Sequence, residues 1–282
     1  MDFGSILVGG AVMAAPIILA SLGGLASERS GVINIGLEGK MLAAAGAAAF
    51  TFLGTGSLAA AIFAALAAGL ALSLLHAWLT QGLKMDHIIS GMAINALALG
   101  GTSFARQVLD VANSGRSLPS FDPLPFFFAA VAAVAVGQLV LTRTGIGLRL
   151  RAVGEDPDRA RESGFKPEVT RVWALGVCGL LCGGSGAFIA LNAGGFVDNM
   201  TAGRGYIALA ALILGRWKPI PTALAGLAFG MLESLQIALQ GRPIGGFEVP
   251  SQAWQALPYV VGLAALAGLV GHNKAPAGLG RQ

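Results

Sequence analysis

Long apolar runs alternate with short polar breaks along almost the whole chain. No charged residue occurs from Gly4 to Ala26, and between Lys40 and Lys84 the only titratable side chain is that of His76. A helix needs about 20 apolar residues to cross the hydrocarbon core of a membrane, so the second run is long enough for two crossings. The pattern predicts nine membrane-spanning helices, at residues 4–26, 32–53, 58–79, 87–105, 124–142, 171–192, 205–217, 219–240 and 255–272.

Composition supports this all-α integral membrane fold. Hydrophobic residues make up 55% of the chain and charged residues only 11%, whereas a soluble domain carries roughly 25% charged residues. The net charge of +4 comes from basic residues in the connecting segments, which is how membrane proteins set their orientation and does not indicate nucleic-acid binding. We therefore expect one polytopic transmembrane domain at residues 1–272, surrounded by membrane lipid, and a short tail at 273–282.

The distribution of lysine and arginine predicts the orientation. Residues 143–171 hold seven of the eighteen basic residues, so this loop is expected in the cytoplasm. Counting crossings from there places the N-terminus outside and the tail inside. Fourteen basic residues then lie inside, and only Arg106, Arg116, Arg204 and Arg242 lie outside.

The seventh segment, 205–217, is too short to cross unaided. A re-entrant segment would put the basic tail outside, so the sequence favours a full but interrupted crossing. A weak internal repeat supports this: residues 31–36 (GVINIG) and 205–210 (GYIALA) each follow a small-residue helix and a polar break. Five crossings separate the two units, which predicts an inverted repeat with broken helices, a common transporter plan.

Polar residues are concentrated at the start of the second segment. The stretch 31–40 (GVINIGLEGK) contains three glycines together with Asn34, Glu38 and Lys40. Polar groups at membrane depth are tolerated where they face protein or a watery cavity, so one interpretation is a broken helix that lines the translocation path. The alternative is an interfacial helix end with snorkelling charges. A phosphate-binding loop is excluded, because that motif needs Ser or Thr where Met41 stands.

A short capped helix is predicted inside the cytoplasmic loop. Asp156 suits the N-cap, Pro157 the first helical position, and Gly164 the position after the helix end. A rigid charged helix between two membrane spans suits docking to a cytoplasmic partner, whereas the alternative is a solvated loop that only fixes topology. The segment comprises Gly154, Glu155, Asp156, Pro157, Asp158, Arg159, Ala160, Arg161, Glu162, Ser163 and Gly164.

Three further polar residues lie within predicted spans. Glu233 could be a proton carrier, a substrate ligand or a buried structural acid. Asn95 and Asn192 could contact substrate or bridge helices. Cys178 and Cys182 are interpreted as packing residues, as are glycines spaced four apart. No His, Cys, Asp or Glu spacing suggests a metal site or a catalytic centre, so we expect neither an enzyme nor a bound cofactor.

Three motifs resemble the permeases of bacterial nucleoside and simple-sugar ABC importers. They are SERSGVINIGLEG at 27–39, RAVGEDP at 151–157 with Ala160 and Gly164, and GRGYIALA at 203–210 followed by GRW at 215–217. The resemblance covers nearly the whole chain, in order. The sugar permeases of this group usually carry an extra first helix, which this chain lacks, as does the shorter partner of the nucleoside-type heterodimers.

The resemblance implies a transport subunit in the bacterial inner membrane. Such a permease pairs with a second permease or a copy of itself, binds two cytoplasmic ATPase subunits that hold the ATP, and receives substrate from an external binding lipoprotein. It also implies that residues 154–164 form the coupling helix that contacts the ATPase. The expected substrate is a nucleoside, or next a simple sugar. The main alternative is an ion-coupled secondary transporter that uses Glu233.

Overall fold

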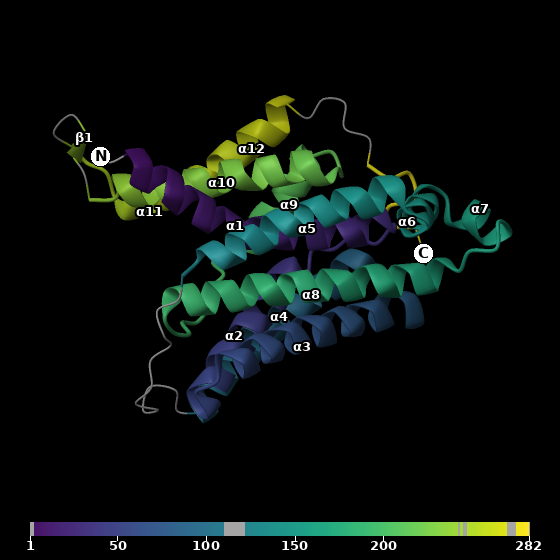
Figure 1. The fold of residues 1–282 in the computed structure, drawn as a ribbon, viewed down its shortest axis with the longest axis horizontal. Helices are drawn as coiled ribbons and strands as arrows, with labels where there is room; N and C mark the ends of the chain where they lie inside the picture. Colours follow the sequence, from purple (N-terminus) through teal and green to yellow (C-terminus); the bar gives the residue numbers. More distant parts are fainter. Residues whose placement is uncertain (1–2, 110–121, 242, 245–246, 270–274, 282) are drawn as a thin grey trace.

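The computed structural model describes residues 3–109, 122–241, 243–244, 247–269 and 275–281 (Figure 1). Arg116, Arg242 and Lys274, which entered the charge count, lie outside this part of the chain, as does the end of the predicted segment 255–272. Within it, the predicted all-helical architecture is confirmed, except for a small hairpin. That hairpin pairs the two-residue strands β1 (Pro243–Ile244) and β2 (Phe247–Glu248) in antiparallel fashion.

Six helices in the described residues are long and apolar enough to cross a membrane. Each of them matches a predicted segment. They are α1 (Phe3–Arg29), α3 (Leu58–Ala77) with its π-helical extension η1 (Trp78–Gly82), α4 (His87–Val108), α5 (Leu124–Arg143), α8 (Pro167–Ala193) and α10 (Pro219–Leu239).

Three other predicted segments form shorter or more polar helices. The second segment becomes α2 (Leu37–Thr55), whose first turn contains Glu38. The seventh becomes α9 (Arg204–Leu214), only 11 residues long. The last becomes α11 (Ser251–Gln255) and α12 (Leu257–Leu269). The membrane-crossing criterion of length and hydropathy therefore covers six of the nine predicted spans.

Helices α1 and α8 form the centre of the bundle. Each has 27 residues, they pack against each other, and they run in opposite directions (Figure 1). Their neighbours correspond: α1 packs on α9 and α10, as α8 packs on α2 and α3. Likewise α2 packs on α3 and α4, as α9 packs on α10 and α12. This exchange of equivalent neighbours is what an inverted repeat of four helices produces.

The predicted pairing of residues 31–36 with residues 205–210 in the repeat is nevertheless wrong. Residues 31–36 lie in the non-helical break before α2, whereas residues 205–210 lie inside α9. The structure instead pairs the helix start at Leu37 with the start at Arg204, each preceded by a glycine, Gly36 or Gly203. Short stretches of similar sequence do not identify equivalent positions in this chain, because small and branched apolar residues occur throughout it.

The segment 194–217 crosses the full thickness of the bundle. It begins at the C-terminal end of α8, and it ends where Trp217 donates an indole hydrogen bond to Glu28 at the C-terminal end of α1 (Nε1–Oε2 2.6 Å). Because α1 and α8 are antiparallel, these two ends lie on opposite sides. Helix α9 spans only about 16 Å at 1.5 Å per residue. The irregular residues 194–203 supply the rest, as an interrupted crossing requires.

Glycines allow the central helices to approach closely. A Cβ at Gly179 of α8 would lie 2.6 Å from the carbonyl oxygen of Gly69 in α3. A Cβ at Gly230 of α10 would lie 2.5 Å from the backbone nitrogen of Ala14 in α1. The predicted packing role of these glycines is therefore confirmed.

Candidate functional site

The break between α1 and α2, residues 30–36, is organised around a buried asparagine. Asn34 is completely buried and donates from Nδ2 to the Ser27 hydroxyl and the Cys178 thiol, at 3.1 Å each. Its Oδ1 accepts a hydrogen bond from the ammonium of Lys40 (3.0 Å). The Lys40 Nζ also lies 3.1 Å from Nδ1 of His76 on α3. Asn34 thus holds the break in place and is closed off from solvent in the described part of the chain.

The snorkelling interpretation of this motif is wrong. Lys40 and Glu38 are 0% and 7% exposed, and both side chains end on protein groups. A charge buried in this way is tolerated only where it is paired and hydrogen-bonded. The motif is therefore a network internal to the bundle, and Cys178 is part of it as a hydrogen-bond acceptor as well as a packing residue.

Glu38 caps the second broken helix, α9. Its Oε1 accepts hydrogen bonds from the Thr201 hydroxyl (2.6 Å) and the Gly203 backbone nitrogen (2.8 Å), and its Oε2 accepts from the Gly205 nitrogen (2.6 Å). The first N–H groups of a helix have no partner within the helix, and a carboxylate there also interacts favourably with the helix dipole. A Cβ at Gly205 would lie 2.4 Å from the Glu38 backbone nitrogen, so glycine is required for this approach.

Asn95 of α4 plays the matching role at the start of α2. Its Oδ1 accepts from the Gly39 backbone nitrogen (2.8 Å), and its Nδ2 donates to the Ile35 carbonyl (3.1 Å) and to the hydroxyl of Tyr206 (3.0 Å). Unlike Asn34, Asn95 is only half-buried, and Tyr206 is 46% exposed. This amide therefore joins both broken helices and still reaches a surface of the bundle.

A second tyrosine lies beside the start of α9. Tyr259 of α12 is 41% exposed, and its hydroxyl donates to the Ala202 carbonyl. Tyr206 and Tyr259 are the only two tyrosines in the sequence, and both lie where the broken helix α9 begins. Asn95, Tyr206 and Tyr259 are all partly exposed around the start of α9, and we call these three residues the tyrosine face.

Glu233 is paired inside the bundle. Its carboxylate oxygens lie 3.1 and 3.2 Å from Nε of Arg204, the first residue of α9, and Glu233 is 8% exposed. Of the three roles considered for this acid, the geometry matches the buried structural one. Asn192, by contrast, is exposed near the end of α8 and lies apart from the network around Glu38.

The predicted capped helix is present as α7 (Pro157–Glu162). The Asp156 carboxylate accepts from the backbone nitrogens of Asp158 and Arg159 at 3.1 Å each, and Gly164 has φ +86°. The loop also contains a second helix, α6 (Gly145–Glu155), which the sequence analysis did not predict. That helix was missed because its short apolar pattern is interrupted by three glycines.

The end of the chain binds the base of this loop. The Gly278 nitrogen donates to the Gly154 carbonyl (2.9 Å), and the Gly280 nitrogen donates to the Gly31 carbonyl (2.9 Å). The Ala277 nitrogen donates to the Glu155 carboxylate (3.2 Å). The tail, α6 and the break before α2 are thus directly connected at the end of the bundle that carries α7 (Figure 1).

Arg171, predicted only to be a basic residue of the cytoplasmic loop, has a structural role that no local pattern indicates. Its guanidinium is 1% exposed and donates to the Ser30 carbonyl (3.2 Å), the Gln81 amide oxygen (3.2 Å) and the Arg281 carbonyl (2.8 Å). It therefore joins α8 to the break, to η1 and to the tail. Tyr206 and Tyr259 were also missed, although their scarcity and their place beside a predicted broken helix could have indicated them.

Apolar helices arranged as an inverted repeat around two interrupted helices define a polytopic membrane transport protein. The family of permease components of branched-chain amino acid transport systems matches this chain over residues 6–266. The chain belongs to this family and is a permease component of an ABC transporter. The three sequence motifs predict an ABC permease, and the family match confirms this prediction.

Relatives named as ABC transporter permeases align with most of this chain. The guanosine ABC transporter permease protein NupQ of Bacillus subtilis is 36% identical over 94% of this chain and 92% of that protein. The nucleoside ABC transporter permease protein NupC of Lactococcus lactis is 35% identical over the same shares. A putative glucose ABC transporter permease protein, TsgC13 of Haloferax volcanii, is 32% identical over 85% of this chain and 79% of that protein.

The Glu38 cap gives a first prediction. Glu38→Leu leaves the backbone donors of Gly203 and Gly205 without a partner, at a cost of about 1–3 kcal/mol for each buried group. Glu38→Gln keeps one acceptor oxygen and should destabilise less. Thermal unfolding in detergent, followed by fluorescence-detected gel filtration, should rank the midpoints wild type, then Gln, then Leu.

The matched control is Asn192→Leu, which alters a polar residue that is exposed near the end of α8. It should unfold at the wild-type midpoint. Equal stability of wild type and Glu38→Leu would show that the start of α9 does not depend on this carboxylate.

Proposed function

We propose that this permease component imports nucleosides, in a complex with a second permease, two cytoplasmic ATPase subunits that bind the ATP, and an external substrate-binding lipoprotein. The observation that carries the proposal is the tyrosine face beside the two helix breaks. Aromatic rings stack on nucleobases, and an amide can hydrogen-bond to their edges. Relatives named for guanosine and nucleosides support the same substrate class.

Simple sugars are the second candidate, because a relative named for glucose also aligns over most of the chain. Sugars too can pack on aromatic rings, so the tyrosine face alone does not separate the two classes. The ion-coupled alternative is not supported: Glu233 is neutralised by Arg204 within the bundle, and the chain belongs to a family of permease components.

Within the proposed complex, the translocation path runs along the tyrosine face, where the second permease would complete it. Three polar residues that the sequence suggests for the path are 8% exposed or less, namely Asn34, Glu38 and Glu233. They are proposed to hold the broken helices in position. Asn95 with Tyr206 and Tyr259 would contact the solute, and Asn192 would not.

Uptake by the reconstituted complex tests the substrate class and the path together. Guanosine uptake into vesicles should need ATP, survive a proton uncoupler, and be competed by other nucleosides but not by glucose. Tyr206→Ala should reduce uptake at low guanosine concentration by on the order of tenfold, because base–aromatic stacking is worth about 1–3 kcal/mol. Tyr206→Phe keeps the ring and should lose much less.

The control for this experiment is Phe63→Ala, which removes a 74% exposed aromatic ring from α3, away from the tyrosine face. Equal uptake by Tyr206→Ala and Phe63→Ala would place the path elsewhere in the bundle. Competition by glucose but not by nucleosides would replace the nucleoside proposal by the sugar one and leave the permease class intact.

We further propose nine crossings, with the N-terminus outside and the tail inside. The charge distribution supports the orientation, and the structure supports the relative arrangement. The N-terminus and α11 lie at one end of the bundle, and α7 and the tail lie at the other (Figure 1). Both native cysteines are buried, so an introduced surface cysteine would be labelled over a low background.

Cysteine labelling in intact cells checks this topology. A cysteine at Ser251, exposed at the start of α11, should react with a membrane-impermeant maleimide. A cysteine at Ser163, exposed at the end of α7, should react only after the cells are permeabilised. The reverse pattern would invert the orientation.

The helix α7 is proposed to contact the ATPase, within the coupling segment 154–164. Six residues are too few for a stable isolated helix, so α7 depends on the Asp156 cap and on its partner. The side chain of Arg159 is 86% exposed, and among the described residues its one ion pair is with Asp156 (3.2 Å). Its guanidinium is therefore available to a partner, as expected for a docking helix.

Charge reversal at this position tests the contact. Arg159→Glu should leave the protein folded and in the membrane but reduce co-purification with the ATPase and abolish uptake. Lys166→Glu makes the same charge change in the same loop but outside α7. This variant should retain most of the co-purification with the ATPase and most of the uptake. If both variants behave like wild type, the loop sets topology and α7 is not the docking element.

A further inference from the structure

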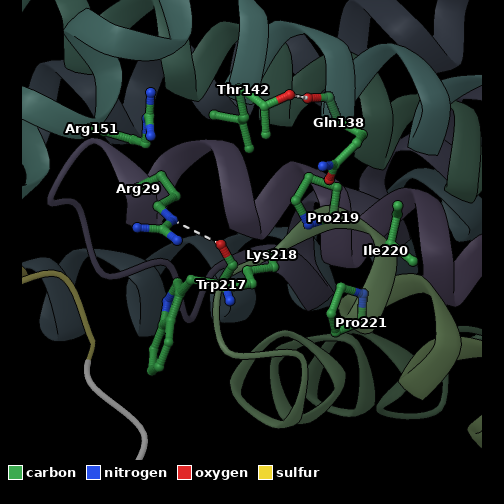
Figure 2. Close-up of a pocket in the computed structure, with 10 residues that line it drawn as sticks. Arg29, Gln138, Thr142, Arg151, Trp217, Lys218, Pro219, Ile220 and Pro221 are labelled. Carbon is green, nitrogen blue, oxygen red and sulfur yellow. Dashed lines mark hydrogen bonds between the residues drawn. The ribbon is translucent and has the colours of Figure 1, made fainter.

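A basic pocket lies at the end of the bundle that carries α6. It has a volume of about 490 Å³ and lies between the C-terminal ends of α1 and α5, helix α6, and the start of α10 (Figure 2). Its lining residues are Arg29, Gln138, Leu141, Thr142, Arg151, Trp217, Lys218, Pro219, Ile220 and Pro221. The proposed function assigns no role to this pocket.

The pocket carries positive charge without a matching acid in its lining. Arg29, Arg151 and Lys218 contribute three cations, and none of the ten lining residues is acidic. The closest carboxylate to Arg29 among the described ion pairs is that of Glu155, at 3.9 Å, at the limit of an ion pair. Lys218 is exposed, and its ammonium has no hydrogen-bond or ion-pair partner within the described part of the chain.

Donor capacity remains on the two arginines. Arg29 uses Nε for the Trp217 carbonyl (2.7 Å), as Figure 2 shows, and Arg151 uses Nε for the Gly147 carbonyl (3.3 Å). A guanidinium has five N–H donors, so most of those on each arginine remain available to an anion. Arginine forks and a lysine point charge are the groups that proteins use to bind phosphate.

Apart from the cations and the polar side chains of Gln138 and Thr142, the lining of the pocket is apolar. Helices α1 and α5 end here and α10 begins here, so the pocket lies where the hydrocarbon core meets the headgroup layer. Leu141 and three residues from the start of α10 contribute to this apolar lining, and one of them, Ile220, is 48% exposed. Three cations beside several apolar side chains match a molecule with a phosphate head and a hydrocarbon tail better than a free anion.

We propose that this pocket binds the phosphate of an anionic membrane phospholipid. Basic pockets between transmembrane helices are a known way to hold such headgroups, and each Lys or Arg near an anionic membrane surface is worth about 1 kcal/mol. Because Arg151 belongs to α6 and Lys218 precedes α10, one lipid would connect the base of the α7 loop to the core helices. This goes beyond the proposed transport function.

Lipid titration of the purified importer complex, followed by native mass spectrometry, tests the proposal. Phosphatidylglycerol should bind in preference to phosphatidylcholine. Lys218→Gln should weaken phosphatidylglycerol binding about fivefold, and the triple change of Arg29, Arg151 and Lys218 to Gln should remove the preference. Lys218→Gln breaks no described interaction, so the variant should fold even if the triple variant does not.

Arg143→Gln is the matched control, since it removes a basic charge from the end of α5 outside the pocket and should leave binding unchanged. A separate arm adds inorganic phosphate without lipid. Three results would each overturn the proposal: equal binding of the two lipids, unchanged binding by Lys218→Gln, or saturation of the pocket by free phosphate that excludes the lipid.

Discussion

The rest of this structure depends on how the first backbone N–H groups of α9 are satisfied. Within a bilayer no water is available for such groups, so an interrupted helix needs a partner from the protein itself. The Glu38 carboxylate supplies it by accepting from the Gly203 nitrogen (2.8 Å) and the Gly205 nitrogen (2.6 Å), and it also accepts from the Thr201 hydroxyl (2.6 Å). Since Glu38 belongs to the first turn of α2, the same contact fixes the two broken helices to each other. Asn95 completes the arrangement by accepting from the start of α2.

The same constraint operates at the opposite side of the first break. There the free carbonyl of Ser30 is satisfied by Arg171, which also holds Gln81 and the backbone of Arg281. A buried guanidinium is stable only with several such acceptors. The result is mechanical as well as energetic: the loop that carries α6 and α7, residues 275–281 and the break before α2 share one hydrogen-bonded region. A displacement of α6 would therefore also displace the residues of the break before α2.

Charged and polar side chains inside the bundle fall into two groups. Lys40, Glu38, Glu28 and Glu233 are buried and end on a protein partner, so each stabilises a helix end or a helix pair. Asn95, Tyr206 and Tyr259 keep part of their surface exposed. Burial with a partner, more than polarity at membrane depth, separates the structural residues from those available to a solute or to a second subunit.

The sequence by itself determined the membrane class, the long helices, the Asp156-capped helix and the permease family. These follow from local features: apolar run length, a cap residue followed by proline, and contiguous motifs. Only the tertiary structure decided that Asn34 and Glu38 face inward, that Arg171 binds three separate segments, and that Glu233 pairs with Arg204. The partners belong to different helices or breaks, 163 residues apart for Glu38 and Thr201 and 29 for Arg204 and Glu233. Hydropathy records how apolar a segment is and not which side chain it will meet, so such contacts arise only when the helices pack together.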